Sequence, residues 1–202
     1  MFFLSFCCLL VSPTPTPDKL QPRVSPYPIY ISNITYSGEG CPSASESVEI
    51  AVIPGSGNIE ITYTNLTART GSAIPSRDNF VGCWVTFTLN YPAGKTFASY
   101  NSTLSGDINL STPTLDAARW STYKSTGHPV VSFETRWPLG YKGAYSVTDH
   151  VALGVDPGSC PKRTQAWFEL ETHVGVPYIR EGYGQIDALK QVLVFNWAKC
   201  QV

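Results

Sequence analysis

The segment Glu169-Leu170-Glu171 carries two carboxylates whose spacing suits general acid–base chemistry. On a β-strand, alternate residues point to one face, so these carboxylates would lie about 6–7 Å apart. Glycoside hydrolases use two such groups, one as the acid and one as the nucleophile or base. The spacing falls between those of retaining and inverting enzymes. The alternative is an exposed polar strand face, which a half-solvated sheet requires, and we favour it.

Other catalytic patterns are weaker. Asp149 and His150 are neighbours, and neighbours on a strand point to opposite faces, which argues against their acting together. The segment Gly55-Ser56-Gly57 lacks the G-x-S-x-G spacing of a nucleophile elbow. No phosphate-binding glycine motif occurs, and the sequence indicates no cofactor. The first histidine is His128, so no cleavage near residues 12–30 exposes the amino-terminal histidine that copper-dependent polysaccharide oxidation needs.

Aromatic side chains suggest a different chemistry, which is stacking on sugar rings. We select Trp120, Trp137 and Tyr141 as candidate stacking residues, because they fall in a glycine-containing region that also holds basic side chains. Trp84 and Trp167 lie on the polar sides of their expected strands. The alternative is that these rings pack in the core, as large aromatic residues commonly do.

Six cysteines are present, and the first two lie in an apolar leader. The other four are widely spaced and form no C-x-x-C pair, so disulfides are favoured over a zinc site. Four cysteines allow three connectivities. We predict Cys41–Cys83 and Cys160–Cys200, because each pair ties neighbouring segments of the chain.

The amino terminus has the features of a secretory leader. Residues 2–11 are almost wholly apolar, a length that suits a signal peptide and is too short to span a bilayer. A buried strand or an imperfect gene start remains the alternative, because no basic residue precedes the run. We predict a signal peptide at residues 1–17 and a proline-rich tail at residues 18–29. Four N-x-[ST] sequons also favour an extracellular location: Asn33, Asn65, Asn101 and Asn109.

Strands must position these side chains. Residues 83–91 alternate strictly, with Cys83, Val85 and Phe87 on one face and polar residues or Trp84 on the other. Similar alternation predicts strands near residues 48–52, 59–63, 166–171 and 192–200. Glycine and proline punctuation between them predicts an all-β antiparallel sandwich or jelly roll over residues 30–202. The segment Thr112–Trp120 has a capping residue and proline at the first helical position, so we expect at most one short helix, there.

Composition excludes several classes of protein. Charged residues make up 14% of the chain and the net charge is -1, so there is no basic excess for binding nucleic acid. No apolar run reaches the length of about 18 residues that a membrane span needs. At 43% hydrophobic, the chain is too apolar to be disordered.

Several segments resemble a family of small secreted fungal proteins known as domain of unknown function 4360. These are residues 34–42 (ITYSGEGCP), 79–83 (NFVGC), 91–94 (YPAG) and 197–200 (WAKC), together with Tyr145, Asp149 and Cys160. The resemblance implies a secreted, β-rich, disulfide-bonded fold and no activity.

Two functions follow from these observations. The first is a secreted, non-enzymatic protein that binds carbohydrate of a cell wall or host surface. The second is a secreted glycoside hydrolase that uses Glu169 and Glu171.

Overall fold

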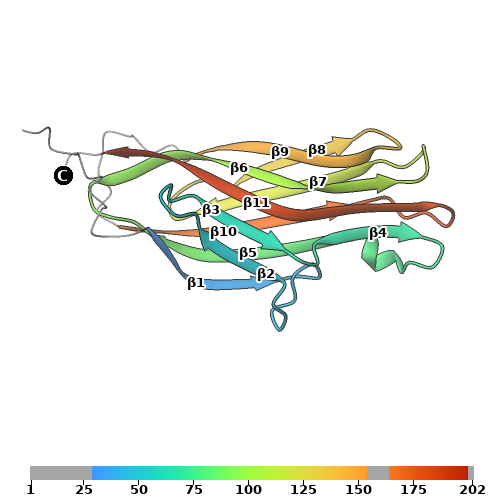
Figure 1. Cartoon of the computed structure of the whole chain (residues 1–202), viewed down its shortest axis with the longest axis horizontal. Helices are drawn as coiled ribbons and strands as arrows, with labels where there is room; N and C mark the ends of the chain where they lie inside the picture. Colours follow the sequence, from blue (N-terminus) through green and yellow to red (C-terminus); the bar gives the residue numbers. More distant parts are fainter. Residues whose placement is uncertain (1–28, 154–163, 200–202) are drawn as a thin grey trace, which may run out of the picture.

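The computed structural model describes residues 29–153 and 164–199, which form two antiparallel β-sheets packed face to face (Figure 1). The predicted all-β sandwich is confirmed. The signal peptide, most of the proline-rich tail, Cys160 and Cys200 lie outside the described residues, so those predictions stand as predictions.

Sheet A contains five strands and sheet B contains six. In spatial order, sheet A consists of β1 (Tyr30–Ser37), β5 (Phe80–Asn90), β10 (Gln165–Gly175), β7 (Ala117–Ser125) and β8 (Val131–Trp137). Sheet B consists of β2 (Val48–Val52), β3 (Ile59–Tyr63), β11 (Tyr183–Lys199), β6 (Lys95–Leu110) and β9 (Lys142–Ala152), and β4 (Thr67–Gly71) pairs with one end of β11. Strands of both sheets run roughly along the long axis of the molecule (Figure 1).

Strand β5 shows why the sequence folds in this way. Its inward residues Cys83, Val85, Phe87 and Leu89 are at most 1% exposed, whereas the alternate residues are half-buried on the outer face. The period-two pattern therefore places an apolar row between the sheets. On the neighbouring strand β10, Phe168 stacks on Phe87 with ring centroids 5.3 Å apart, which joins the two rows within the core.

The prediction of at most one short helix is confirmed for the described residues, but the segment Thr112–Trp120, where we expected it, does not form one. Residues 112–116 form a turn, in which the amide of Leu115 donates to the carbonyl of Thr112, and strand β7 begins at Ala117. Alternate β7 residues are buried from Ala117 to Ser125, so tertiary burial with period two overrides the local helical signal. In the described part of the chain the helical element is the single 3-10 turn η1 (Ser76–Asn79).

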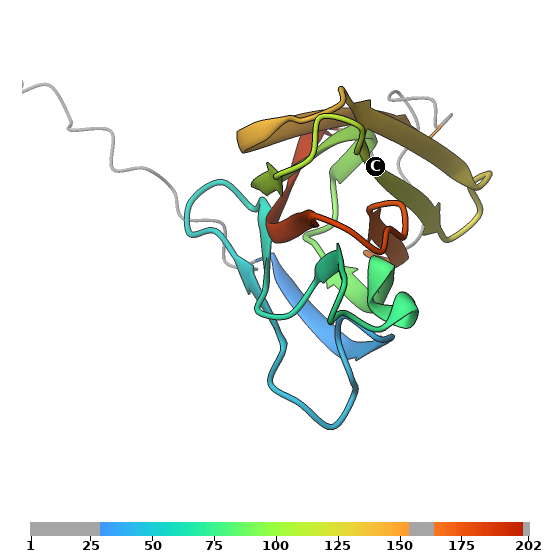
Figure 2. The same ribbon diagram turned by 90° about the vertical axis from the view of Figure 1, so that its right-hand side faces the viewer.

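One predicted disulfide is confirmed. Cys41 follows β1, and it bonds to Cys83 in the paired strand β5, with Cα atoms 5.4 Å apart. Both cysteines are fully buried. The bridge therefore fixes the turn after β1 against the start of β5, close to η1. Figure 2 looks at this end of the sandwich along the strands.

We predict that removing this bridge destabilises the domain markedly. The bond closes a loop with a sequence separation of 42. Replacing both cysteines by alanine should lower the free energy of unfolding by roughly 4 kcal/mol, because the unfolded chain gains loop entropy. Urea denaturation of the oxidised protein and of the double variant measures the difference.

Peptide mapping without reductant is the control for connectivity. It should recover a peptide that contains Cys41 joined to Cys83. Recovery of Cys41 joined to Cys200 instead would contradict the assignment.

Candidate functional site

Four rings gather on the outer face of sheet A, at the end of the sandwich where η1 lies. We call Phe80, Trp84, Trp120 and His173 the aromatic cluster. The Phe80 ring stacks on His173 at 5.0 Å and lies tilted against Trp120 at 5.3 Å. Trp84 meets His173 edge to face, with ring centroids 5.0 Å apart. Phe80 is 47% exposed, so this apolar surface faces solvent rather than the core.

Glycines create the room for these rings. A side-chain carbon at Gly82 would lie 2.4 Å from the His173 ring, and one at Gly175 would lie 3.0 Å from Phe80 and 3.2 Å from Trp120. Glycine in a strand interior often marks a close approach of this kind. The cluster therefore rests directly on the backbone of β5 and β10.

Gly38, in the turn after β1, packs beneath the ring of Trp84. Its φ of 132° lies in the region that favours glycine. A side-chain carbon there would lie 2.3 Å from the carbonyl oxygen of Gly82 and 2.9 Å from the Trp84 ring. Only glycine fits, so the turn after β1 packs against both β5 and Trp84.

A hollow of about 180 Å³ adjoins the cluster. This volume is small beside the 300–1,000 Å³ of sites that enclose a drug-sized ligand, so the hollow suits a single ring-sized group. Its lining is mainly apolar, with polar groups from Asn79, Asp116 and Arg136. The lining residues are Asn79, Phe80, Asp116, Ala118, Trp120, Arg136, Gly175, Val176 and Pro177.

One cation and two carboxylates lie beside the cluster. The Arg136 guanidinium lies 5.9 Å from the centre of the Trp120 ring, and it pairs with Glu134 at 2.6 Å and with Asp116 at 3.5 Å. A cation in this position is attracted to the ring face. The surface therefore offers hydrogen-bonding groups and no excess of positive charge that would select an anionic ligand.

The two candidate catalytic carboxylates lie on this same outer face of β10. The Oε1 atom of Glu169 is 2.5 Å from Nζ of Lys124, and Oε1 of Glu171 is 2.7 Å from Nε2 of His173. The hydrogen bond to Glu169 raises the pKa of Lys124 above its ordinary value, because it stabilises the charged amine. Neither carboxylate lines the hollow, so the hollow does not hold the pair over a common reacting atom as the glycosidase hypothesis requires.

The three candidate stacking residues occupy different environments. Trp120 is half-buried on the outer face and lines the hollow. Trp137 is only 8% exposed and contacts Tyr145 at 4.5 Å within the core, so its ring offers no free face for a ligand. Tyr141 is half-buried after β8, where its hydroxyl donates to the carbonyl of Ala144 at 2.9 Å. The structure thus separates Trp120 from the other two.

Phe80 and His173 were not selected from the sequence as candidate binding residues. Trp84 was noted only as a tryptophan on the polar side of its strand. The signal that could have found them was Gly82 and Gly175, which interrupt strand-like segments beside aromatic residues. The expectation that Trp84 and Trp167 lie on outer faces agrees with their positions, and Trp167 is 40% exposed.

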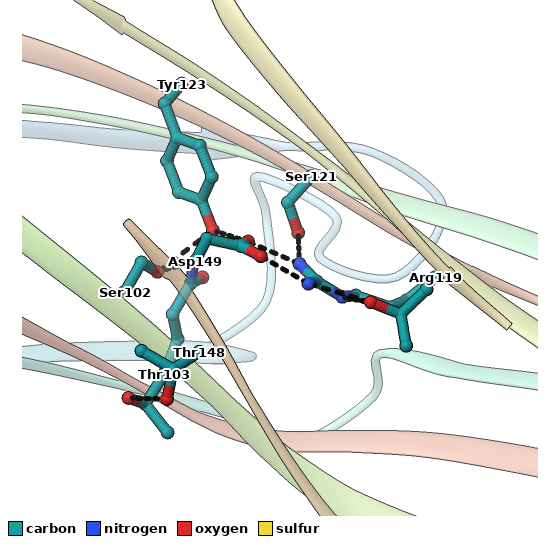
Figure 3. Close-up of polar contacts among 9 residues, drawn as sticks. Ser102, Thr103, Arg119, Ser121, Tyr123, Thr148 and Asp149 are labelled. Atoms are coloured by element: carbon teal, nitrogen blue, oxygen red, sulfur yellow. Dashed lines mark hydrogen bonds and ion pairs between the residues drawn. The ribbon is translucent and has the colours of Figure 1, made fainter. Parts of the chain in front are cut away.

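A network of polar side chains lies buried between the two sheets, away from solvent (Figure 3). Arg119 of β7 is 1% exposed and Asp149 of β9 is 4% exposed. Nη1 and Nη2 of Arg119 donate to the two carboxylate oxygens of Asp149, each at 2.5 Å. Tyr123 donates to the same carboxylate at 2.7 Å. Burial alone would lower the pKa of Arg119, but the hydrogen bonds and charge of Asp149 raise it above its ordinary value.

The network continues through the core. Gln191 of β11 donates to Ser102 at 2.8 Å and accepts a hydrogen bond from Tyr63 at 2.6 Å. His150 points to the opposite face from Asp149, and it bonds to Asn101 at 2.8 Å. The expectation that Asp149 and His150 do not act together therefore agrees with the geometry. Because the network is buried and its charges are paired, we assign it a structural role.

The four sequon asparagines lie at different places on the surface. Asn101 and Asn109 are on β6 of sheet B, and Asn65 is exposed between β3 and β4. Asn33 is exposed in the edge strand β1, and its amide donates to Thr88 of β5 at 3.4 Å. A glycan on Asn33 would therefore extend beside sheet A.

Within residues 29–153 and 164–199, no three metal-binding side chains come together. That part of the chain also contains no helix long and apolar enough to cross a membrane.

The fold and this surface define a disulfide-bonded β-sandwich protein with an aromatic cluster on one outer face. The chain belongs to the family described as a domain of unknown function, DUF4360, which it matches over residues 28–200. The resemblance seen in the sequence is thereby confirmed as far as the family is concerned. No curated protein matches the chain.

Solved structures give only distant similarities. A family 61 carbohydrate-binding module in complex with β-1,4-galactotriose is 11% identical, covers 83% of this chain and 89% of its own, and has a TM-score of 0.35. The carbohydrate-binding module CBM6 of LamC from Zobellia galactanivorans is 15% identical, with 79% and 98% covered and a TM-score of 0.25. A family 11 carbohydrate-binding module from Clostridium thermocellum is 12% identical, with 87% and 89% covered and a TM-score of 0.22. At such scores, function must be argued from this chain's own surface.

We predict that Asp149→Ala destabilises the domain by about 3–5 kcal/mol, because it leaves the buried Arg119 charge without its partner. Urea denaturation measures the change. Lys124→Ala removes a surface ion pair and is the matched control, with an expected loss far smaller than that of Asp149→Ala. Replacing the buried pair together, as Arg119→Met with Asp149→Leu, should cost less than Asp149→Ala. Equal losses in the single and double variants would contradict the role of the uncompensated charge.

Alkaline pH should also destabilise the domain. Burial raises the pKa of Tyr63, Tyr100, Tyr123 and Tyr145 well above the ordinary value. Below about pH 10 both the folded and the unfolded states keep these protons, so the contribution of the buried tyrosines to the free energy of unfolding is fully present. As pH rises further, the unfolded chain loses protons first, and each phenol should cost about 1.4 kcal/mol by pH 11.

Denaturation at pH 9 and pH 11, together with phenolate absorbance, tests this prediction. The four phenols should ionise only when the chain unfolds. Their titration near pH 10 in the folded protein would contradict it.

Proposed function

We propose that this protein is a secreted, non-enzymatic carbohydrate-binding protein. In this proposal it retains polysaccharide of a cell wall or host surface on the outer face of sheet A. The observation that carries the proposal is the exposed aromatic cluster beside a ring-sized hollow. Large exposed apolar patches on a soluble domain commonly mark binding sites.

The chemistry of the cluster supports a sugar as ligand. Pyranose rings have one apolar face of C–H groups and a rim of hydroxyls. The rings of Phe80 and Trp120 supply apolar faces, and Arg136, Asp116 and Asn79 supply hydrogen-bonding groups around them. An apolar surface with a few well-placed polar groups is the usual composition of a small-ligand site.

The rigidity of the cluster supports the proposal as well. Glycines beneath the rings leave them little room to move toward the sheet. A ring that is already fixed loses little conformational entropy when a ligand stacks on it, so more of the contact energy appears as affinity. Retention in an extracellular space also agrees with the buried Cys41–Cys83 disulfide, since disulfides persist in oxidising compartments.

We predict that Trp120→Ala weakens retention on polysaccharide by on the order of 1 kcal/mol, the scale of a lost aromatic contact. The mature protein is first tested on a glycan array and on cell-wall fractions, and the variant is then compared in pull-down assays. Leu139→Ala is the matched control, because Leu139 is 61% exposed on the β8–β9 turn and is not among the residues that line the hollow. Circular dichroism must show that both variants are folded.

The same assays distinguish a binding protein from an enzyme. Glu169→Gln combined with Glu171→Gln should leave retention nearly unchanged, and the parent should release no reducing sugar. Product release that the double variant loses by about 10²–10⁴-fold would instead establish the glycosidase. Retention equal in the parent, Trp120→Ala and Phe80→Ala would refute binding by the aromatic cluster.

A further inference from the structure

Trp167 is an exposed aromatic ring on the same outer face as the aromatic cluster, but farther along the strands. It is 40% exposed and shares its side of β10 with Glu169, Glu171 and His173. Trp84 lies opposite Glu171 in the β5–β10 register, and Trp167 lies four residues before Glu171. At the rise of a β-strand, Trp84 and Trp167 are therefore separated by about 13 Å along the strands, which is longer than one sugar ring.

Polar side chains fill the interval between the two tryptophans. Thr86 of β5, Glu169 of β10 and Lys124 of β7 are aligned across three adjacent strands by the sheet register. Thr122 of β7 lies opposite Glu171, which is the next outward-facing residue after Glu169 on β10. We call these four residues, Thr86, Thr122, Lys124 and Glu169, the polar strip. Each is half-buried, so it presents its polar end at the surface.

The outer face carries no excess of positive charge. The ammonium of Lys124 pairs with Glu169 at 2.5 Å, and Nε2 of His173 lies within hydrogen-bond distance of Oε1 of Glu171, at 2.7 Å. An anionic polymer would meet no excess of positive charge there. The polar strip also contains no aliphatic side chain, whereas the centre of a protein–protein interface is usually apolar. A neutral chain of hydroxyl-bearing rings matches both properties.

We propose that the outer face of sheet A binds an extended stretch of a neutral, β-linked polysaccharide, from the aromatic cluster across the polar strip to Trp167. This inference rests on the proposed function, and it adds that the ligand is a run of several sugars rather than a chain end. Equatorial β-linkages keep a sugar chain flat enough to follow a sheet surface. One ring fits the hollow, the middle of the chain exchanges hydrogen bonds with the polar strip, and a distant ring stacks on Trp167.

The test uses chain length. The probes are β-1,3-linked glucose, β-1,4-linked glucose and β-1,4-linked N-acetylglucosamine oligomers, each from dimer to hexamer, titrated calorimetrically. N-glycans are first removed enzymatically, because a glycan on Asn33 would lie beside the ligand. For at least one series, the hexamer should bind the parent at least about tenfold more tightly than the dimer.

Three variants separate the two ends of the surface. Trp167→Ala should remove the advantage of the hexamer and leave dimer affinity unchanged, and Trp167→Phe should restore most of that advantage. Trp120→Ala should weaken dimer and hexamer alike. Thermal unfolding of each variant checks that the sheet is intact, which the exposure of Trp167 favours.

The possible outcomes are distinct. If the parent binds dimer and hexamer equally, or if Trp167→Ala keeps the full length dependence, the extended site is overturned while the proposed function stands. If no oligomer of any series binds while the glycan array or a cell-wall fraction retains the protein, the extended site alone is overturned. If the array and the cell-wall fractions are negative as well, the proposed function is overturned with it.

Discussion

The buried ion pair of Arg119 and Asp149 is the interaction on which the arrangement of the two sheets depends. One partner comes from sheet A and the other from sheet B, and both carboxylate oxygens accept hydrogen bonds from the guanidinium. Two charges removed from water are tolerated only when they remain paired and hydrogen-bonded. A slip of β7 against β9 would leave both charges uncompensated, so the pair disfavours other registers as well as stabilising this one.

Inward contacts of this kind also fix the positions of the side chains on the outer face. Neighbouring residues on a strand point in opposite directions, so a fixed inward side chain also fixes the surface residue beside it. Arg119 is followed by Trp120, and the disulfide-bonded Cys83 is followed by Trp84. Thr172, which is fully buried and bonds to Gln191, precedes His173. Each ring of the aromatic cluster on β5, β7 and β10, apart from Phe80 at the start of β5, therefore adjoins a polar or covalent contact in the core.

Glycines on the outer face of the sheet allow the rings to lie close to its backbone. A β-strand with side chains at every outward position would hold the rings apart from the sheet. At Gly82 and Gly175 that carbon is missing, and the rings of His173, Phe80 and Trp120 occupy its place. The cost is a strand with less intrinsic β-propensity at those two positions. The benefit is a compact aromatic surface that the backbone beneath it holds in place.

Alternating hydrophobicity predicted the β-sandwich and the inward row of β5, because period-two burial is a local property of a strand. The same alternation also placed Glu169, Glu171 and Trp167 on one outward face. The Cys41–Cys83 bond was predicted as one of three possible connectivities, on the ground that it ties neighbouring segments of the chain. Tertiary structure decided the rest. It turned Thr112–Trp120 from a locally favoured helix into a turn and strand, because burial between β10 and β8 outweighs helix propensity. It buried Trp137 against Tyr145 in the core. It also left Phe80 exposed opposite Gly175 of β10, because the β5–β10 register joins residues that are far apart in the sequence.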